Sequence, residues 1–364
     1  MRQGIREVAR WTGVRRAALA GAGALALLGA SEARAGSVMA EGSAGGSLRT
    51  WTLLGDVELR KDETFLTLGY TGTRTQSETA LSHQLSAGVD HALNEHWLLS
   101  GLVNVGLPKK STTPLAPERP LLDLPAMSAR TGYRSGGLQL AATYDSAGFS
   151  DVEYGLDAGL GLTLYGLDRE IFTHQTGHQE TLYRREEPLF LARPSLGARL
   201  LLVDKWELGV RGGLYLYSGD PLSSGQFTQA ELKEVMRRYA ANAAEGNLLV
   251  KTFTQRRIKE LAVDLSGRLL GVNALTGFPS APALFDVKPS VTYRFSTWIR
   301  GQLSYAFTRY VPGQGYAHVL GTRWTFRLAD SFRFWASLAL QSDHVQGEAP
   351  LRSGLATLGS ELTF

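Results

Sequence analysis

The chain has no cysteine among its 364 residues, so it forms no disulfide and carries no lipid anchor on an amino-terminal cysteine. A long apolar run is missing as well. Residues 17–30 are unbroken Ala, Leu and Gly, but a membrane-spanning helix needs about 20 apolar residues. A retained helical anchor is therefore the weaker interpretation of this segment.

The stronger interpretation is a secretory signal peptide. Residues 17–30 follow a basic region and precede Ala33-Arg34-Ala35, a small-x-small cleavage site. We expect residues 1–35 to be removed before Gly36, after export by the general secretory route. The basic region consists of Arg2, Arg6, Arg10, Arg15 and Arg16.

The net charge of +4 comes from that segment alone. Residues 1–35 hold six of the 38 Lys and Arg and two of the 34 Asp and Glu, so the remaining chain is neutral. A nucleic-acid partner is therefore not expected. No glycine-rich phosphate loop or Ser-His-acid set stands out either, and we expect no enzyme activity, no cofactor and no metal.

Alternation of apolar and polar residues runs through most of the chain. In residues 331–341, Phe332, Phe334 and Leu338 point to one side, whereas Arg333 and Ser337 point to the other. Each such segment is about the 9–11 residues that a tilted membrane strand needs. Clear segments are 81–93, 96–107, 151–165, 188–203, 206–217, 284–295, 297–310 and 315–328, and weaker ones are 64–76, 121–134, 137–146 and 170–184.

Short polar turns alternate with long loops. Four of these turns are followed at once by an aromatic residue, which is typical of the interfacial girdle beside the periplasmic turns of a membrane barrel. The girdle residues are Trp97, Trp206, Trp298 and Phe332. The longer connections, at 108–120, 218–283 and 342–352, would lie on the other, extracellular side.

The carboxy terminus alternates and ends on an aromatic. Leu358, Leu362 and Phe364 share one face, while Glu361 lies on the other. This ending resembles the closing strand of bacterial outer-membrane β-barrels, although Ser360 stands where an apolar residue is usual. The resemblance implies location in the outer membrane of a Gram-negative bacterium. It also implies contact with outer-membrane lipid, and an assembly signal for the barrel-assembly machinery in Leu358, Leu362 and Phe364.

The sequence therefore predicts an all-β fold, a transmembrane antiparallel β-barrel of about 14 strands, with a range of 12 to 16. The barrel would occupy 64–364, and residues 36–63 would form a periplasmic segment, a plug or an extra strand. We expect residues 218–283 to form a long, partly helical insert in an extracellular loop. This insert would either fold into the lumen or cap the rim. Sequence does not decide between a monomer and a trimer.

Charged residues at the lumen-facing positions form two groups. The basic group contains Arg193, Arg199, Arg211, Lys288, Arg294, Arg300, Arg323, Arg327 and Arg333. The acidic group contains Asp151, Glu153 and Asp157. Charges are costly in hydrocarbon, so we expect them to line a water-filled lumen as two opposed walls. The alternative is a set of static salt bridges in a closed barrel.

These features favour a channel that passes small hydrophilic, anionic solutes. One alternative is the barrel of a polysaccharide or polymer export system that works with periplasmic partners. A second alternative is a non-conducting structural or adhesive barrel with its activity in the loops.

Overall fold

The computed structural model describes most of the chain after residue 35. The described residues are 36–45, 48–61, 63–75, 82–116, 118, 125–146, 152–175, 178–202, 205–221, 229–241, 282–344 and 349–364. The predicted signal peptide, Asp151 and residues 242–281 of the insert lie outside this set. The second helical stretch of the insert, expected near residues 258–269, lies outside it too.

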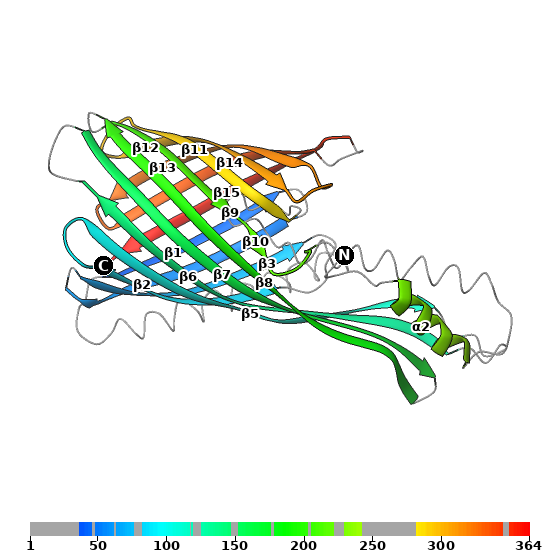
Figure 1. Ribbon diagram of the computed structural model, residues 1–364. Coiled ribbons are helices and arrows are strands. Elements are labelled where there is room, and N and C mark those ends of the chain that lie inside the picture. The colour runs from blue at the N-terminus through cyan, green and yellow to red at the C-terminus, as the bar shows by residue number, and fades with distance from the viewer. Residues whose placement is uncertain are drawn as a thin grey trace, which may run out of the picture.

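The fold is a closed barrel of fourteen antiparallel strands (Figure 1). Each strand pairs with the next along the chain, with one exception. The two-residue β10 follows β9 and also pairs with β8, so it does not count as a separate barrel strand, and β9 pairs with β11. The strands are β1 (Gly36–Gly45), β2 (Leu48–Arg60), β3 (Thr64–Thr75), β4 (Ser82–Ala92), β5 (Trp97–Ala116), β6 (Ala126–Asp145), β7 (Val152–Gln175), β8 (His178–Leu202), β9 (Trp206–Leu214), β10 (Leu216–Tyr217), β11 (Ala283–Arg294), β12 (Ile299–Tyr310), β13 (Tyr316–Ala329), β14 (Phe332–His344) and β15 (Leu351–Thr363). The predicted all-β antiparallel barrel is confirmed.

The two ends of the described chain close the barrel. β1 pairs with β15, and the backbone N–H of Gly36 donates to the carbonyl of Phe364 at 2.9 Å. The N–H of Phe364 donates back to the carbonyl of Gly36 at 3.0 Å. Closure removes both sheet edges, so backbone groups within a bilayer are paired inside the protein.

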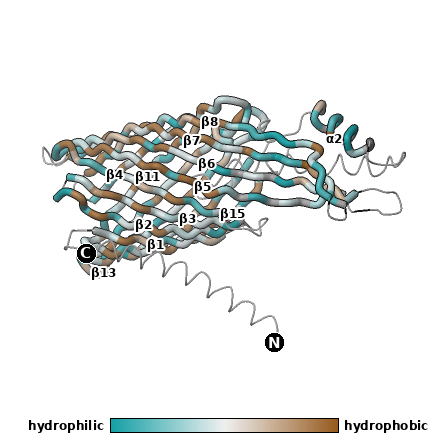
Figure 2. The backbone as a smooth tube through the Cα atoms, turned by 90° about the horizontal axis from the view of Figure 1, so that it is seen from below, coloured by the Kyte–Doolittle hydropathy of each residue, from teal (hydrophilic) through white to brown (hydrophobic). Residues whose placement is uncertain are grey.

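Alternation divides every strand between two environments. Leu338 and Leu340 of β14 lie on the outer face, 63% and 65% exposed, whereas Trp335 and Gln341 are buried on the inner face. In Figure 2, hydrophobic residues recur along the strands of the barrel body, and hydrophilic residues become frequent where β5 to β8 leave it. The outward apolar surface suits lipid, and the inward polar surface suits water.

The barrel has two unlike rims. The terminal rim carries Gly36, Phe364 and the short turns after β2, β4, β8, β11 and β13. The opposite rim, here called the loop rim, carries the connection between β10 and β11 that includes the insert. No helix among the described residues is long and apolar enough to cross a membrane.

Four strands extend far beyond the loop rim. β5 to β8 have 20 to 25 residues, and they project as a sheet, here called the extension, with helix α2 (Gln229–Ala241) against its end (Figure 1). Met127, Ile171 and Leu182 of the extension are buried, as are Val235 and Tyr239 of the helix. The spacing of Val235 and Tyr239 puts both on one helical face, so α2 and the sheet share a small core outside the barrel.

The structure corrects several predicted strands. The strand residues described within segments 121–134 and 137–146 belong to the single strand β6, and 170–184 contains the end of β7 and the start of β8. Residues 36–63 hold β1 and β2, so the barrel begins at Gly36 rather than at residue 64. Two predicted strands are parts of longer strands, and β1 and β2 are two additional strands, so the strand number stays at fourteen. The physical reason is that the extension keeps strand alternation outside the membrane, where sequence length alone suggests additional crossings.

Candidate functional site

A cavity of about 560 Å³ occupies the lumen between β1–β4 and β11–β15. Most of its polar lining is hydroxyl: Ser43, Thr50, Thr52, Thr71, Thr73, Ser304, Ser337 and Thr357. Its charged lining residues are Glu41, Lys288 and Arg323. Such a wall offers hydrogen bonds to a hydrated solute without holding it by a large apolar contact.

All nine predicted basic residues have the inward register. Lys288 is directly opposite Arg211, Arg294 is opposite Arg300, and Arg323 is opposite Gln302 of the cavity wall. Direct cross-strand partners share a face of the sheet, which places these side chains on the lumen side. Arg193, Arg199, Arg327 and Arg333 follow the same register on β8, β13 and β14.

Five of these arginines are neutralised locally. Arg193 contacts Asp286 at 2.9 Å, and Arg211 contacts Asp157 at 3.0 Å. The other three pairs are Arg199 with Asp145, Arg327 with Asp330 at 2.9 Å, and Arg333 with Glu361 at 3.8 Å. Pairing reduces the field that these five residues exert on a passing ion.

Three arginines have no carboxylate partner among the described residues: Arg294, Arg300 and Arg323. Arg294 and Arg300 stand directly opposite each other on β11 and β12. The Arg323 guanidinium lies 4.8 Å from the centre of the Trp335 ring, which is a cation–π contact. These three residues are here called the lumen arginine patch.

Part of the basic group adjoins the acidic residues, and the rest lies across the lumen from them. Glu153 and Asp157 lie inward on β7, two strands from β9, and Asp157, Gly197 and Arg211 follow one another across β7, β8 and β9. The basic residues of β12, β13 and β14 lie four to six strands from β7 around the fourteen-strand barrel. Two opposed walls therefore stay a prediction.

Two inward polar clusters were not predicted from the sequence. Trp335 Nε1 donates to Glu41 Oε2 at 2.9 Å, which joins β14 to a strand that was left outside the predicted barrel. Near the loop rim, Tyr215 donates to Asp286 Oδ2 at 3.1 Å beside Arg193. The alternation of residues 36–45 was the available signal for Glu41, but this strand is rich in Gly, Ala and Ser.

The four predicted girdle residues lie at the terminal rim. Trp97 contacts Tyr144 with ring centres 5.1 Å apart, and Trp206 contacts Tyr293 at 4.5 Å. Trp298 is exposed in a turn, and Phe332 begins β14 on its outward register. A second belt at the loop rim was not predicted: it consists of Tyr70, His83, Tyr305, Phe307, Tyr316, His318 and His344.

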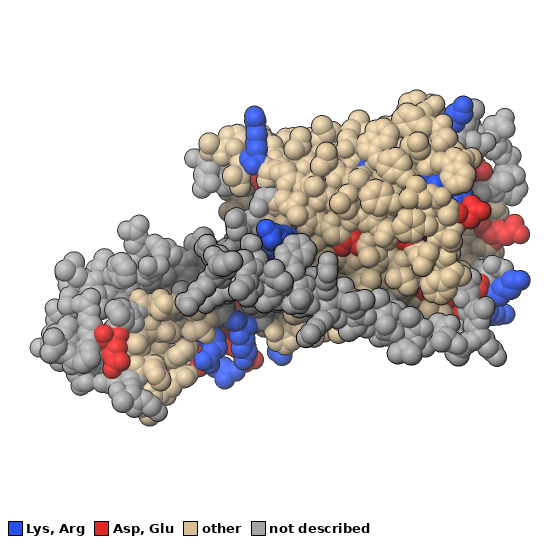
Figure 3. Space-filling view, turned by 180° about the vertical axis from the view of Figure 1, so that it is seen from behind, with Lys and Arg blue, Asp and Glu red and all other residues tan. Residues whose placement is uncertain are grey.

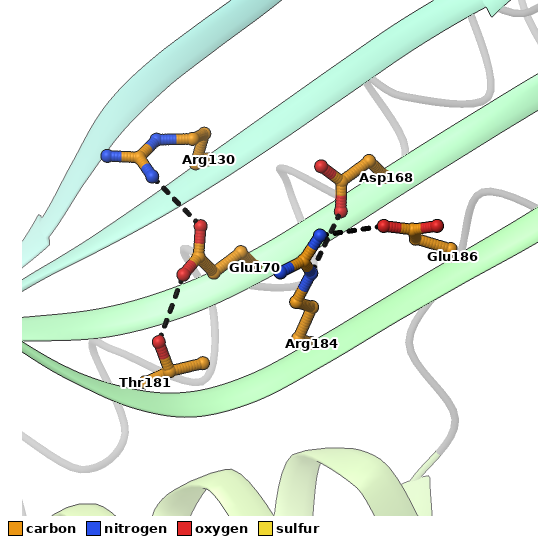
Figure 4. Close-up of polar contacts among 6 residues, drawn as sticks. All are labelled: Arg130, Asp168, Glu170, Thr181, Arg184 and Glu186. Atoms are coloured by element: carbon orange, nitrogen blue, oxygen red, sulfur yellow. Dashed lines mark hydrogen bonds and ion pairs between the residues drawn. The ribbon is translucent and has the colours of Figure 1, made fainter.

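The outer face changes from apolar to charged where the extension begins. Leu164 pairs with Phe190 across β7 and β8, and a few residues farther along Asp168 pairs with Glu186. Figure 4 shows how the carboxylates on this charged surface are paired. Arg184 contacts Glu186 at 2.7 Å and Asp168 at 3.9 Å. Such a switch marks the level at which hydrocarbon gives way to water.

Helix α2 is held outside the barrel by polar contacts as well as by its apolar face. Glu231 accepts hydrogen bonds from Tyr183 at 2.7 Å and from Arg185 at 2.5 Å. Burial and the contact with Glu231 raise the pKa of Tyr183 to about 12. Arg238 donates to the carbonyl of Leu182 at 3.1 Å. The described helix therefore caps the extension and does not enter the lumen.

The predicted assembly residues share one outward face. Leu358, Leu362 and Phe364 are all exposed on β15 or directly after it. Their side chains are therefore accessible from outside the barrel. Their role in assembly stays a prediction.

No protein-family model matches the chain, and no curated protein matches its sequence. Solved structures similar in fold include the KdgM porin, with 8% identity, 90% of this chain and 99% of that chain covered, and a TM-score of 0.38. The CymD monoaromatic hydrocarbon channel has 10% identity, coverage of 91% and 88%, and a TM-score of 0.49. The translocator domain of the autotransporter NalP from Neisseria meningitidis has 12% identity, coverage of 97% and 98%, and a TM-score of 0.41.

The barrel's own features identify its class. It is closed, its outer face is apolar, aromatic residues gather at both rims, and the described inner wall is polar. This is the architecture of a bacterial outer-membrane β-barrel, located in the outer membrane of a Gram-negative bacterium.

Proposed function

We propose that the barrel is a channel for small hydrophilic anionic solutes. The observation that carries this proposal is the lumen arginine patch, in which Arg294 and Arg300 face each other without a described carboxylate. Like charges placed opposite each other destabilise a sheet. The presence of this arginine pair is therefore better explained by a role in solute passage than by a contribution to folding. The hydroxyl-lined cavity beside Arg323 supports a hydrated, weakly held cargo.

A liposome-swelling experiment with glucose and gluconate tests this proposal, because the two solutes have similar size and differ in charge. We expect gluconate to enter faster than glucose at low ionic strength, where screening is weak. The triple variant Arg294→Gln/Arg300→Gln/Arg323→Gln should abolish this preference. Equal rates for both solutes in the unmodified protein would contradict the proposal.

The matched control carries Arg49→Gln and Arg74→Gln. These arginines also face each other on neighbouring strands, but on the outer face. The control should retain the preference for gluconate, since its charges do not reach the lumen. Loss of the preference in the control would mean that overall charge, rather than the lumen arginine patch, selects the solute.

A further inference from the structure

Two arginines face each other on the outside of the barrel. Arg49 of β2 is directly opposite Arg74 of β3, next to the pair Thr50 and Thr73. Thr50 and Thr73 line the lumen cavity, and side chains alternate along a strand. Arg49, the second residue of β2, and Arg74, the penultimate residue of β3, therefore point outward beside the loop rim, and both are exposed.

Other outward cations lie at the same rim. Arg309 is opposite Tyr316, whose neighbours on the outer face are His318 and His344, and Arg352 is opposite Ser342 of β14. Lys110 and Arg134 have the outward register where β5 and β6 enter the extension. Figure 3 shows an outer surface that is mostly uncharged over the barrel body, with charged side chains toward its ends.

The described carboxylates of the barrel strands do not balance these cations. Among the described strand residues, every Asp and Glu with outward register belongs to the extension, where Asp168, Glu170 and Glu186 already contact arginines. The acids of the barrel body, such as Asp56 and Asp286, have inward register. Neither Arg49 nor Arg74 has an ion-pair partner among the described residues.

Like charges directly opposite on one sheet face destabilise the sheet. The cost falls when an anion lies between them, and the planar guanidinium fork fits phosphate oxygens in pairs. The depth of Arg49 and Arg74 in the membrane indicates which kind of anion they bind. Aromatic and histidine side chains of the second belt lie at this rim, and such belts sit at the depth of lipid headgroups. A phosphate that is fixed at this depth belongs to a lipid.

We propose that Arg49 and Arg74 form a binding site for the phosphate-bearing headgroup of a membrane lipid in the leaflet beside the loop rim. Arg309 and Arg352 extend the same cationic rim around the barrel. The site holds the lipid from outside and is independent of transport through the lumen. Phospholipid and phosphorylated glycolipid share the phosphate that the site recognises.

The test uses the protein refolded into uncharged detergent micelles, with bound lipid counted by native mass spectrometry. The probes are phosphatidic acid, phosphatidylcholine with the same acyl chains, and inorganic phosphate. We expect the protein to retain phosphatidic acid in preference to phosphatidylcholine. Because two basic contacts near the surface are lost, Arg49→Gln/Arg74→Gln should weaken this retention about tenfold or more.

Arg294→Gln/Arg300→Gln is the matched control, since it removes an equivalent facing pair from the inner wall. It should retain phosphatidic acid as the unmodified protein does. The single variant Arg74→Gln relieves the repulsion and should bind at an intermediate level, which keeps the test open if the double variant fails to fold. Undiminished retention in both outer-face variants would overturn the proposal.

Two further outcomes would also overturn it. Equal retention of phosphatidylcholine would show that the acyl chains, and not the phosphate, determine binding. Displacement of phosphatidic acid by inorganic phosphate at equal concentration would show a site for free phosphate instead of lipid.

Discussion

Arg211 on β9 donates two hydrogen bonds to one carboxylate oxygen of Asp157 on β7, at 3.0 and 3.2 Å. The contact passes over Gly197 of the strand between them, where a Cβ atom would lie 1.8 Å from that oxygen. Glycine therefore leaves the space in which an acidic and a basic residue of the lumen meet. The pair is partly exposed to solvent, so its contribution to stability is small, about 0–1 kcal/mol.

The Arg211–Asp157 pair should influence selectivity more than stability. Asp157→Asn leaves Arg211 unpaired and should increase the preference of the channel for anions, whereas Arg211→Gln should decrease it. The double variant restores local neutrality and should return close to the original selectivity. Reversal potentials measured in a salt gradient give this comparison, and a double variant shifted as far as either single one would contradict it.

Glu231 should control both the ionisation of Tyr183 and the docking of α2. Burial and Glu231 raise the pKa of Tyr183 to about 12, above its unfolded value near 10. The associated stability is therefore present below pH 10 and is lost as the pH rises from about 10 to about 12. Glu231→Gln should lower the pKa of Tyr183, because it removes a negative charge beside the phenol.

Tyrosinate absorbance, taken as the difference between each protein and its Tyr183→Phe variant, measures this shift. Glu234→Gln is the control, since Glu234 lies on the same helix and contacts Arg237 and Arg238 instead. The control should leave the pKa of Tyr183 unchanged. A titration midpoint that is unaffected by Glu231→Gln would refute the proposed coupling.

Trp206 should anchor the terminal rim through its contact with Tyr293, whose ring centre is 4.5 Å away. An aromatic pair contributes about 0.5–1.5 kcal/mol beyond the area that it buries. Trp206→Ala should therefore lower the free energy of unfolding in lipid vesicles by more than Leu208→Ala, a truncation on the same strand and face. Urea unfolding followed by fluorescence decides, and equal losses would argue against a girdle role.

Phe364 should matter for assembly in cells more than for the folded barrel. Its side chain is exposed, and its backbone makes the closing hydrogen bonds with Gly36 that Phe364→Ala keeps. We expect Phe364→Ala to reduce the amount of barrel in the outer membrane while refolding in detergent stays normal. Phe295→Ala, which truncates another exposed aromatic, is the control. Equal membrane levels for both variants would remove the assembly role.

Period-two alternation was sufficient to predict a barrel and the facing of every described charged residue in the two predicted groups. It did not reveal the extension, because Asp168 and Glu186 replace apolar residues on the outward register without interrupting the strand. It also missed β1, whose small side chains give little contrast between faces. Hydropathy pattern reports the environment of a residue and carries little information on how far a strand projects.

The ion pairs between lumen residues could not be predicted from the sequence for a different reason. The contact of Arg211 with Asp157 depends on the register of three strands and on the absence of a side chain at Gly197. Arg211 and Asp157 come side by side only when β7, β8 and β9 pair in this register. The lumen arginine patch was therefore visible as part of a basic group, but not as its unneutralised part.

The reversal potential of single channels in a planar bilayer shows whether the barrel is an anion channel. With a tenfold gradient of potassium chloride across the refolded protein, we expect discrete current steps and a reversal potential of the sign given by chloride permeation. Arg294→Gln/Arg300→Gln/Arg323→Gln should move that potential toward zero. A barrel that conducts no current, or one whose reversal potential has the sign given by potassium, would contradict an anion channel.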